Sequence, residues 1–113
     1  MSKDQQIEQE IQDKGLTAPR ITPQDIEDNI DSEVSFVVGK VLGAVDPIPN
    51  HPSLNLLTIC VITLANGFVV TGESACASPE NFDEEVGHKI ARQNAVAKIW
   101  PLMGYELRSK LAE

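Results

Sequence analysis

The pair Asn66-Gly67, set between two apolar segments, constrains the fold more than any other feature of this chain. Asn-Gly is the preferred pair for a two-residue β-hairpin turn of type I′. The preceding segment, LNLLTICVITL, has apolar residues at both odd and even positions, which is typical of a strand covered on both faces. We therefore predict a β-hairpin with strands at about residues 54–64 and 68–77.

A two-residue turn would also fix the register of the hairpin, with Ala65 opposite Phe68. Cys60 would then lie opposite Glu73, and Cys76 would point to the other face of the sheet. This geometry does not favour a disulfide, and reduced thiols are typical of the cytoplasm. The chain has no apolar run of roughly 20 residues, and its start, MSKDQQIEQE, lacks the apolar part of a signal peptide. We expect a cytoplasmic protein that does not enter a membrane.

Capping signals predict a short helix at the N-terminus. Ser2 and Gln5 have the spacing of a capping box, and Gly15 marks a stop, which gives a helix over residues 3–14. Its apolar face holds only two isoleucines, and an isolated helix of about 12 residues is marginal in water. Residues 1–20 are therefore interpreted as an N-terminal helix and linker, mobile unless something docks the helix.

A second start signal, Thr22-Pro23, is followed by apolar residues at intervals of three or four. This spacing predicts an amphipathic helix over residues 23–42, although the segment SFVV within it could instead begin a strand. The next segment, DPIPNHPSLN, contains three prolines and is typical of a loop.

The last long helix is predicted over residues 82–100, with Asn81 and Glu84 as its capping box. Apolar residues lie on two sides of it, so we expect one side on the sheet and the other on a helix or in a homodimer. Pro101 should end or kink it, leaving a short C-terminal helix in MGYELRSKLAE. The fold class is therefore α+β: a small antiparallel sheet packed against helices, in one domain over residues 21–113.

The charge of the chain is unevenly distributed. The net charge is −8, and residues 1–50 hold ten acidic and four basic groups. A negative surface repels phosphate, so nonspecific binding of nucleic acid is disfavoured, although such runs usually serve only solubility.

Glu73, Ser74, Cys76 and His88 are the reactive side chains that form a candidate polar cluster. The segment GESAC resembles part of a nucleophile motif but lacks the second glycine of a nucleophile elbow. A thiolate pair of Cys76 with His88 would need a thiol pKa lowered by a helix N-terminus. We therefore expect no enzymatic activity.

The chain has two cysteines and two histidines, Cys60, Cys76, His51 and His88, which is the raw number for a zinc site. No CxxC or HxxxH spacing is present, and Cys60 falls within the apolar strand. No metal and no cofactor is expected.

Three basic residues of the last helix, Lys89, Arg92 and Lys98, form a candidate binding site for nucleic acid or nucleotides. The segment GHKIARQNAVAKIW is similar to the last helix of double-stranded-RNA-binding domains, which contact phosphates with basic residues at the helix start. Here the start is acidic, with Asp83-Glu84-Glu85, and a third strand is not evident. Nucleic-acid binding is thus an alternative hypothesis.

Three segments, TAPRITPQDIEDNI, NGFVVTGESACASPENFD and GHKIARQNAVAKIWPLMGYEL, carry a more specific resemblance. They resemble a family of small tailed-bacteriophage proteins named after gene products forty-nine and sixty-six of two phages. The resemblance implies a phage or prophage gene acting in the bacterial cytoplasm, but it supplies no activity, cofactor or site residue. Our hypothesis is a non-enzymatic accessory protein that binds a host or phage protein.

Overall fold

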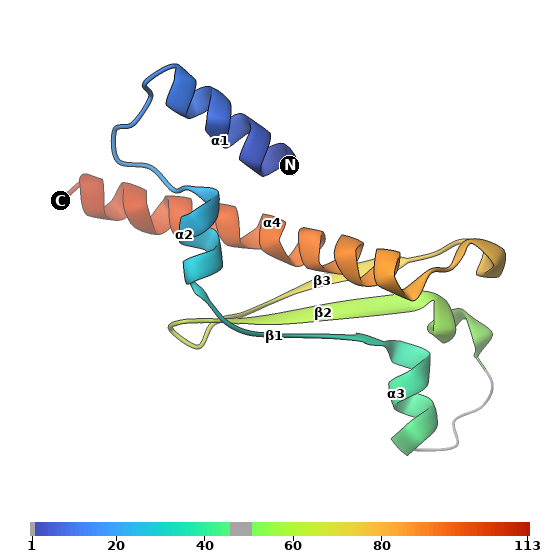
Figure 1. The fold of residues 1–113 in the computed structure, drawn as a ribbon. Coiled ribbons are helices and arrows are strands. Elements are labelled where there is room, and N and C mark those ends of the chain that lie inside the picture. Colours follow the sequence, from blue (N-terminus) through green and yellow to red (C-terminus); the bar gives the residue numbers. More distant parts are fainter. Residues whose placement is uncertain (1, 46–50) are drawn as a thin grey trace.

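A computed structural model describes residues 2–45 and 51–113 as an α+β fold around a three-stranded antiparallel sheet (Figure 1). The strand order is β1 (Ile30–Val37), β2 (Leu57–Leu64) and β3 (Val69–Ala75). The long helix α4 (Glu84–Leu111) crosses one face of this sheet. The predicted fold class is confirmed. The predicted loop falls partly on residues 46–50, which lie outside the described residues.

The N-terminal helix, α1 (Lys3–Asp13), forms as predicted. The Ser2 hydroxyl accepts a hydrogen bond from the Gln5 amide at 3.1 Å, and the Gln5 side chain accepts one from the Ser2 amide at 3.1 Å. At the other end, the Leu16 amide donates to the Ile11 carbonyl at 3.1 Å, and Gly15 has a positive φ of 69°. These are the bonds of a Schellman stop.

The predicted helix over residues 23–42 is wrong in its middle, where residues 30–37 form a strand. Helix α2 (Pro23–Asp28) starts at Thr22 with the expected cap, but it ends at Asn29. The chain then forms β1, which pairs with β2 over most of its length, and turns into helix α3 (Val38–Val45). The apolar spacing of this segment fits a helix or a strand. Its β-branched residues form a strand because they pair with the central strand β2.

The hairpin forms, but its turn has three residues instead of two. The Leu64 amide donates to the Phe68 carbonyl at 2.8 Å, and the Gly67 amide donates to the Leu64 carbonyl at 2.9 Å. A type I′ turn requires positive φ at both central residues. Here Gly67 has φ 89°, whereas Asn66 does not have positive φ. The strands are also shorter than predicted, because residues 52–56 form a 3₁₀ turn before β2.

The longer turn shifts the register by one residue. Cys60 pairs with Gly72 instead of Glu73, which pairs with Ile59 on the opposite face. Cys76 therefore belongs to the same face as Cys60, in contrast to the prediction. Both cysteines are free thiols.

Helix α4 differs from its prediction at both ends. Asn81 lies in a separate 3₁₀ turn (Pro79–Asn81), and the cap is Asp83, whose carboxylate accepts a hydrogen bond from the Val86 amide at 2.9 Å. The helix then continues through Pro101 to Leu111, so the separate short C-terminal helix was a wrong prediction. Met103 packs against the core just after the proline, which favours continuation of the helix.

The contact between α4 and the sheet is unusually close at β3. The buried residues of α4 are Gly87, Ala91, Ala95 and Ile99, spaced by four along one side of the helix. A Cβ atom placed on Gly72 would overlap the carbonyl oxygen of Ala91 and the amide nitrogen of Ala95. Only glycine at position 72 allows the helix backbone to approach the strand this far.

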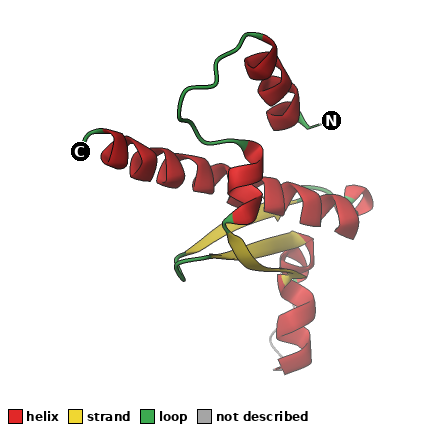
Figure 2. Cartoon of the chain, turned by 60° about the vertical axis from the view of Figure 1, so that its left-hand side comes forward, coloured by secondary structure: helices red, strands yellow, loops and turns green. Residues whose placement is uncertain are grey.

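The opposite face of the sheet is here called the open face. Its apolar side chains include Val34, Phe36, Ile59, Val61 and Val69, and the polar residues Ser32, Thr63, Thr71 and Glu73 share it. Val34 is 58% exposed and Val69 is 49% exposed. In two views, α4 lies on one side of the sheet and α3 on the other, at one end of the open face (Figures 1 and 2). The helices thus leave part of an apolar surface uncovered.

Replacement of Gly72 by Ala should lower the free energy of unfolding by roughly 1–3 kcal/mol, because the added methyl overpacks the α4 contact. Gly104 of α4 is the control, because a Cβ there meets no atom within 4 Å. Gly104→Ala should raise the stability by roughly 0.5–1 kcal/mol. Urea unfolding of both variants measures this, and a Gly72→Ala protein as stable as the wild type would contradict the packing described.

Candidate functional site

The structure does not bring the three basic candidates together. Lys89 and Arg92 line a groove of about 500 Å³ between α1, α2 and α4. Lys98 instead lines a second groove on the other flank of α4, beside β3. The predicted basic site is therefore divided between two surfaces.

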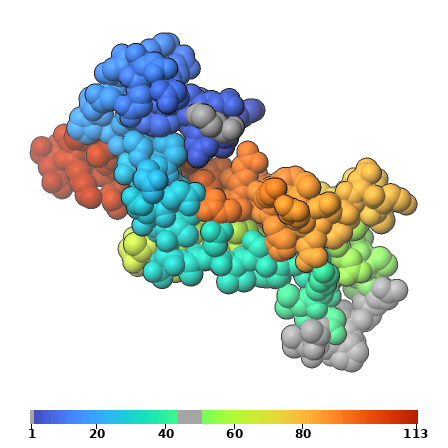
Figure 3. Space-filling model, viewed as in Figure 1, coloured from blue at the N-terminus to red at the C-terminus, as the bar shows by residue number. Residues whose placement is uncertain are grey.

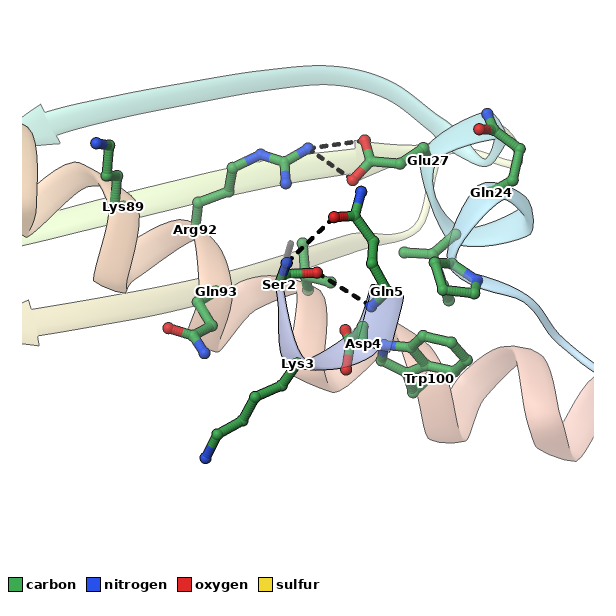
Figure 4. Close-up of a pocket in the computed structure, with 13 residues that line it drawn as sticks. Ser2, Lys3, Asp4, Gln5, Gln24, Glu27, Lys89, Arg92, Gln93 and Trp100 are labelled. Carbon is green, nitrogen blue, oxygen red and sulfur yellow. Dashed lines mark hydrogen bonds and ion pairs between the residues drawn. The ribbon is translucent and has the colours of Figure 1, made fainter. Parts of the chain in front are cut away.

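Arg92 is held by two carboxylates from different elements. Its Nε donates to Glu33 of β1 at 2.8 Å, and its Nη2 donates to both oxygens of Glu27 of α2, at 2.9 and 3.2 Å. Figure 4 shows the Arg92 side chain reaching from α4 toward Glu27. The hydrogen bonds to Glu27 and Glu33 raise the pKa of Arg92 above its ordinary value. Arg92 therefore connects α2, β1 and α4 and is not free to bind phosphate.

The start of α4 is also dominated by ion pairs. Lys89 lies 3.2 Å from Glu85, one turn earlier in the helix. Glu84 accepts a hydrogen bond from Lys40 of α3 at 2.7 Å, and this bond lowers the pKa of Glu84. Strand β1 supplies the third strand that the likeness to double-stranded-RNA-binding domains requires. However, the basic residues at this helix start are paired with carboxylates.

The candidate polar cluster is only half assembled. Ser74 and Cys76 line one hollow beside the start of α4, and the Cys76 thiol donates to the Ser78 carbonyl at 3.2 Å. Glu73 lies on the opposite face of β3, where its carboxylate accepts a hydrogen bond from the Thr71 hydroxyl at 3.2 Å. His88 is instead near Glu84, with its Nε2 3.7 Å from that carboxylate. The four side chains form no common site.

Helix α1 forms one wall of the groove that contains Arg92, but it packs loosely. No residue of α1 is buried, and Ile7 is 55% exposed. Trp100 of α4 lines this groove and also an adjacent hollow with Ile7 and Ile11. Figure 3 shows the N-terminal segment standing out above the body of the molecule.

An ion pair between Glu8 and Arg20 fastens α1 to the linker that follows it. Both terminal nitrogens of Arg20 donate to the carboxylate of Glu8 at 2.6 Å. These bonds lower the pKa of Glu8 to about 2 from an ordinary value of 4.5. Whether the N-terminal segment moves stays a prediction, but its attachment depends on one charged contact and a few apolar side chains.

The groove beside β3 was missed in the sequence. It has a volume of about 560 Å³ and is lined by the exposed side chains of Phe68, Val69, Leu102 and Tyr105. Lys98, Leu102 and Tyr105 recur at helical spacing, which is a readable signal. The predicted helix end at Pro101 conceals this signal, because Leu102 and Tyr105 lie beyond it.

The fold and these surfaces define a small α+β protein with surface grooves on both flanks of α4 and an open sheet face. The chain belongs to the phage protein (N4 Gp49/phage Sf6 gene 66) family, whose model matches residues 21–111. This confirms the resemblance found in the sequence. Comparison with curated proteins and with solved structures gave no match.

Two features are absent from residues 2–45 and 51–113. No helix there is long and apolar enough to cross a membrane. No group of three or more His, Cys, Asp or Glu side chains in this part of the chain is placed to hold a metal ion.

The attachment of α1 should depend on pH through Glu8. Because the folded pKa of Glu8 is below its ordinary value, the ion pair contributes fully above about pH 4.5 and is lost as the pH falls toward about 2. Trp100 is the single tryptophan, so its fluorescence reports on the groove. Glu8→Gln should shift Trp100 emission to the red at pH 7, as acid does in the wild type. Glu10→Gln, which breaks the exposed pair with Lys14, should leave the emission unchanged; equal spectra for all three proteins would show that Glu8 does not hold α1.

Proposed function

We propose that this phage or prophage protein is a non-enzymatic accessory protein that acts in the bacterial cytoplasm by binding a host or phage protein. The observation that carries the proposal is the open face. Apolar sheet surfaces are normally covered by another layer, and large uncovered ones mark interaction sites. Membership of the phage family supports the viral setting.

The composition of the open face suits a protein partner. Its strand residues include Val34, Phe36, Ile59 and Val61, and Glu73 is the charged residue that faces the same side from β3. Interface centres are depleted of charge and enriched in apolar and aromatic side chains. A partner with an apolar surface would therefore bury this face at little desolvation cost.

The alternative function, binding of nucleic acid or a nucleotide through Lys89, Arg92 and Lys98, is less well supported. Two of these residues are paired with carboxylates, and the net charge is −8. Phosphate binding would have to break those pairs and overcome long-range repulsion.

Photo-crosslinking in infected or lysogenic cells tests the proposal, with a photoreactive amino acid placed at Val34 or, as a matched control, at Val86. Val86 is 51% exposed, similar to Val34, but it lies on α4 away from the open face. We expect one protein to be captured from position 34 and not from position 86. Binding of that protein should weaken at least roughly tenfold on Val34→Lys and stay unchanged on Val86→Lys.

Two results would count against this function. One is that no protein is captured specifically from position 34, that is, from position 34 and not from position 86. The other is salt-dependent binding of RNA, DNA or a nucleotide that is lost on Lys89→Glu, which would support the alternative.

A further inference from the structure

We infer that the outer edge of β3 and the groove beside it form a site for an extended segment of a partner protein, which adds as a fourth strand and places an acidic side chain against Lys98. The inference rests on the proposed function and names its binding mode. Strand addition uses main-chain hydrogen bonds for affinity and side-chain pockets for specificity.

The backbone of β3 is free for such pairing. β3 is the last strand of the sheet, so one of its edges has no strand partner. The Leu64 amide bonds the carbonyl of Phe68, and the Cys76 amide bonds the Leu56 carbonyl. Along an antiparallel strand, the main-chain amide and carbonyl groups of successive residues point to opposite edges. The even-numbered residues of β3 therefore bond to β2, and the main-chain groups of the odd-numbered residues point outward. Val69 and Thr71 therefore present their amide and carbonyl groups at the edge.

One interaction limits the length of this free edge. The side-chain amide of Asn94 donates to the Glu73 carbonyl at 2.8 Å, and so occupies the outward position after Thr71. Helix α4 thus covers the later part of the edge and leaves the part beside Val69 and Thr71 open. Uncovered edge segments of this kind are natural templates for another strand.

The groove lies directly beside this open part of the edge. Val69 and Thr71 line it from the strand, and Leu102 and Tyr105 line it from α4. Leu102 is 41% exposed and Tyr105 is 79% exposed. An added strand would point alternate side chains toward these residues, and its other side chains would extend the open face.

Lys98 determines the charge of the expected partner. It lines the same groove, and its ammonium group forms no ion pair or hydrogen bond within the described residues. It lies one turn from Asn94 and one turn from Leu102, on the flank of α4 that overlooks β3. A cation in an apolar groove favours a carboxylate on the ligand. Lys98 lines the groove together with Val69 and Thr71 of the open part of the edge, so we assign the carboxylate to an acidic side chain of the segment that pairs there.

A second copy of this chain fits the groove less well. A symmetric antiparallel pair of β3 strands, centred on Val70 so that Val69 of one copy pairs with Thr71 of the other, would place the two Lys98 side chains near the two-fold axis and thus near each other. Like charges in that position are unfavourable. The other edge of the sheet is also a weaker candidate, because β1 carries Asp31 and Glu33.

The probes for this site are three acetylated and amidated peptides of alternating Thr and Val, with Glu, Gln or Lys at one central position. Titration into ¹⁵N-labelled protein should move the amide signals of Val69, Thr71 and the α4 residues around Lys98. The Glu peptide should bind roughly two- to fivefold more tightly than the Gln peptide, as for an exposed ion pair. Lys98→Glu should reverse the order so that the Lys peptide binds best. Lys89→Glu, outside the groove, should leave the order unchanged.

Thr71→Pro tests the main-chain pairing separately. The Thr71 amide points outward, so proline removes no bond to β2 and is tolerated at an edge. We expect peptide binding to be lost while the remaining amide spectrum keeps its native positions. If this variant does not fold, the reversal by Lys98→Glu decides the question.

Three outcomes would overturn the inference: β3 amides that none of the peptides moves, a peptide order that Lys98→Glu does not change, or unchanged affinity in folded Thr71→Pro protein. Shifts of the same amides with protein concentration alone would identify a second copy as the occupant, against our assignment. If only the binding mode is wrong, crosslinking from position 34 is still expected in each case. Failure of the peptide experiment can therefore be distinguished from failure of the proposed function.

Discussion

The close approach of α4 to β3 at Gly72 is the contact on which the rest of the structure depends. The backbones of Ala91 and Ala95 occupy the space that a side chain at position 72 would fill. This contact sets the height and direction of α4 over the sheet. It thereby determines that one face carries the core, that the other face stays apolar and uncovered, and that α4 shields the later part of the β3 edge through Asn94.

Charge arranges the elements around this contact. Arg92 draws Glu27 of α2 and Glu33 of β1 to the same point on α4, and Glu84 binds Lys40 of α3 in the same way. Exposed ion pairs each contribute little stability, but here they join elements that are distant in the sequence. The acidic N-terminal half is thus partly a set of attachment points for basic residues of the chain itself. This use of Arg92 and Lys89 leaves Lys98 as the basic candidate without a carboxylate partner among the described residues.

Much of the fold could be predicted from local signals in the sequence. The caps of α1 and α2, the hairpin and the packing helix followed from short-range chemistry at Ser2, Thr22 and Asn66-Gly67. The errors came from long-range effects. The spacing of residues 30–41 fits both helix and strand, and only the presence of β2 decides between them. The hairpin register depended on one backbone angle at Asn66 that composition does not determine.

The candidate sites were harder to predict, because they are made where elements meet. The sequence identified Arg92 and Lys98 as basic residues of one helix, but their spacing of six residues turns them about 240° apart around the axis, so they line grooves on different flanks. Likewise, Glu73 and Ser74 are neighbours in the chain but lie on opposite faces of β3. Residue type and spacing therefore predicted which side chains had chemical potential, and the tertiary structure determined which of them share a surface.

The passage of α4 through Pro101 has a consequence for the dynamics of the helix. Proline has no amide hydrogen, so the Ala97 carbonyl has no partner in the helix at that turn. The buried residues of α4 all precede this point, the last being Ile99. The first part of α4 can therefore open only when the sheet contact breaks, whereas the part after Pro101 can fray by itself. We therefore expect α4, which is one helix in shape, to unfold as two units.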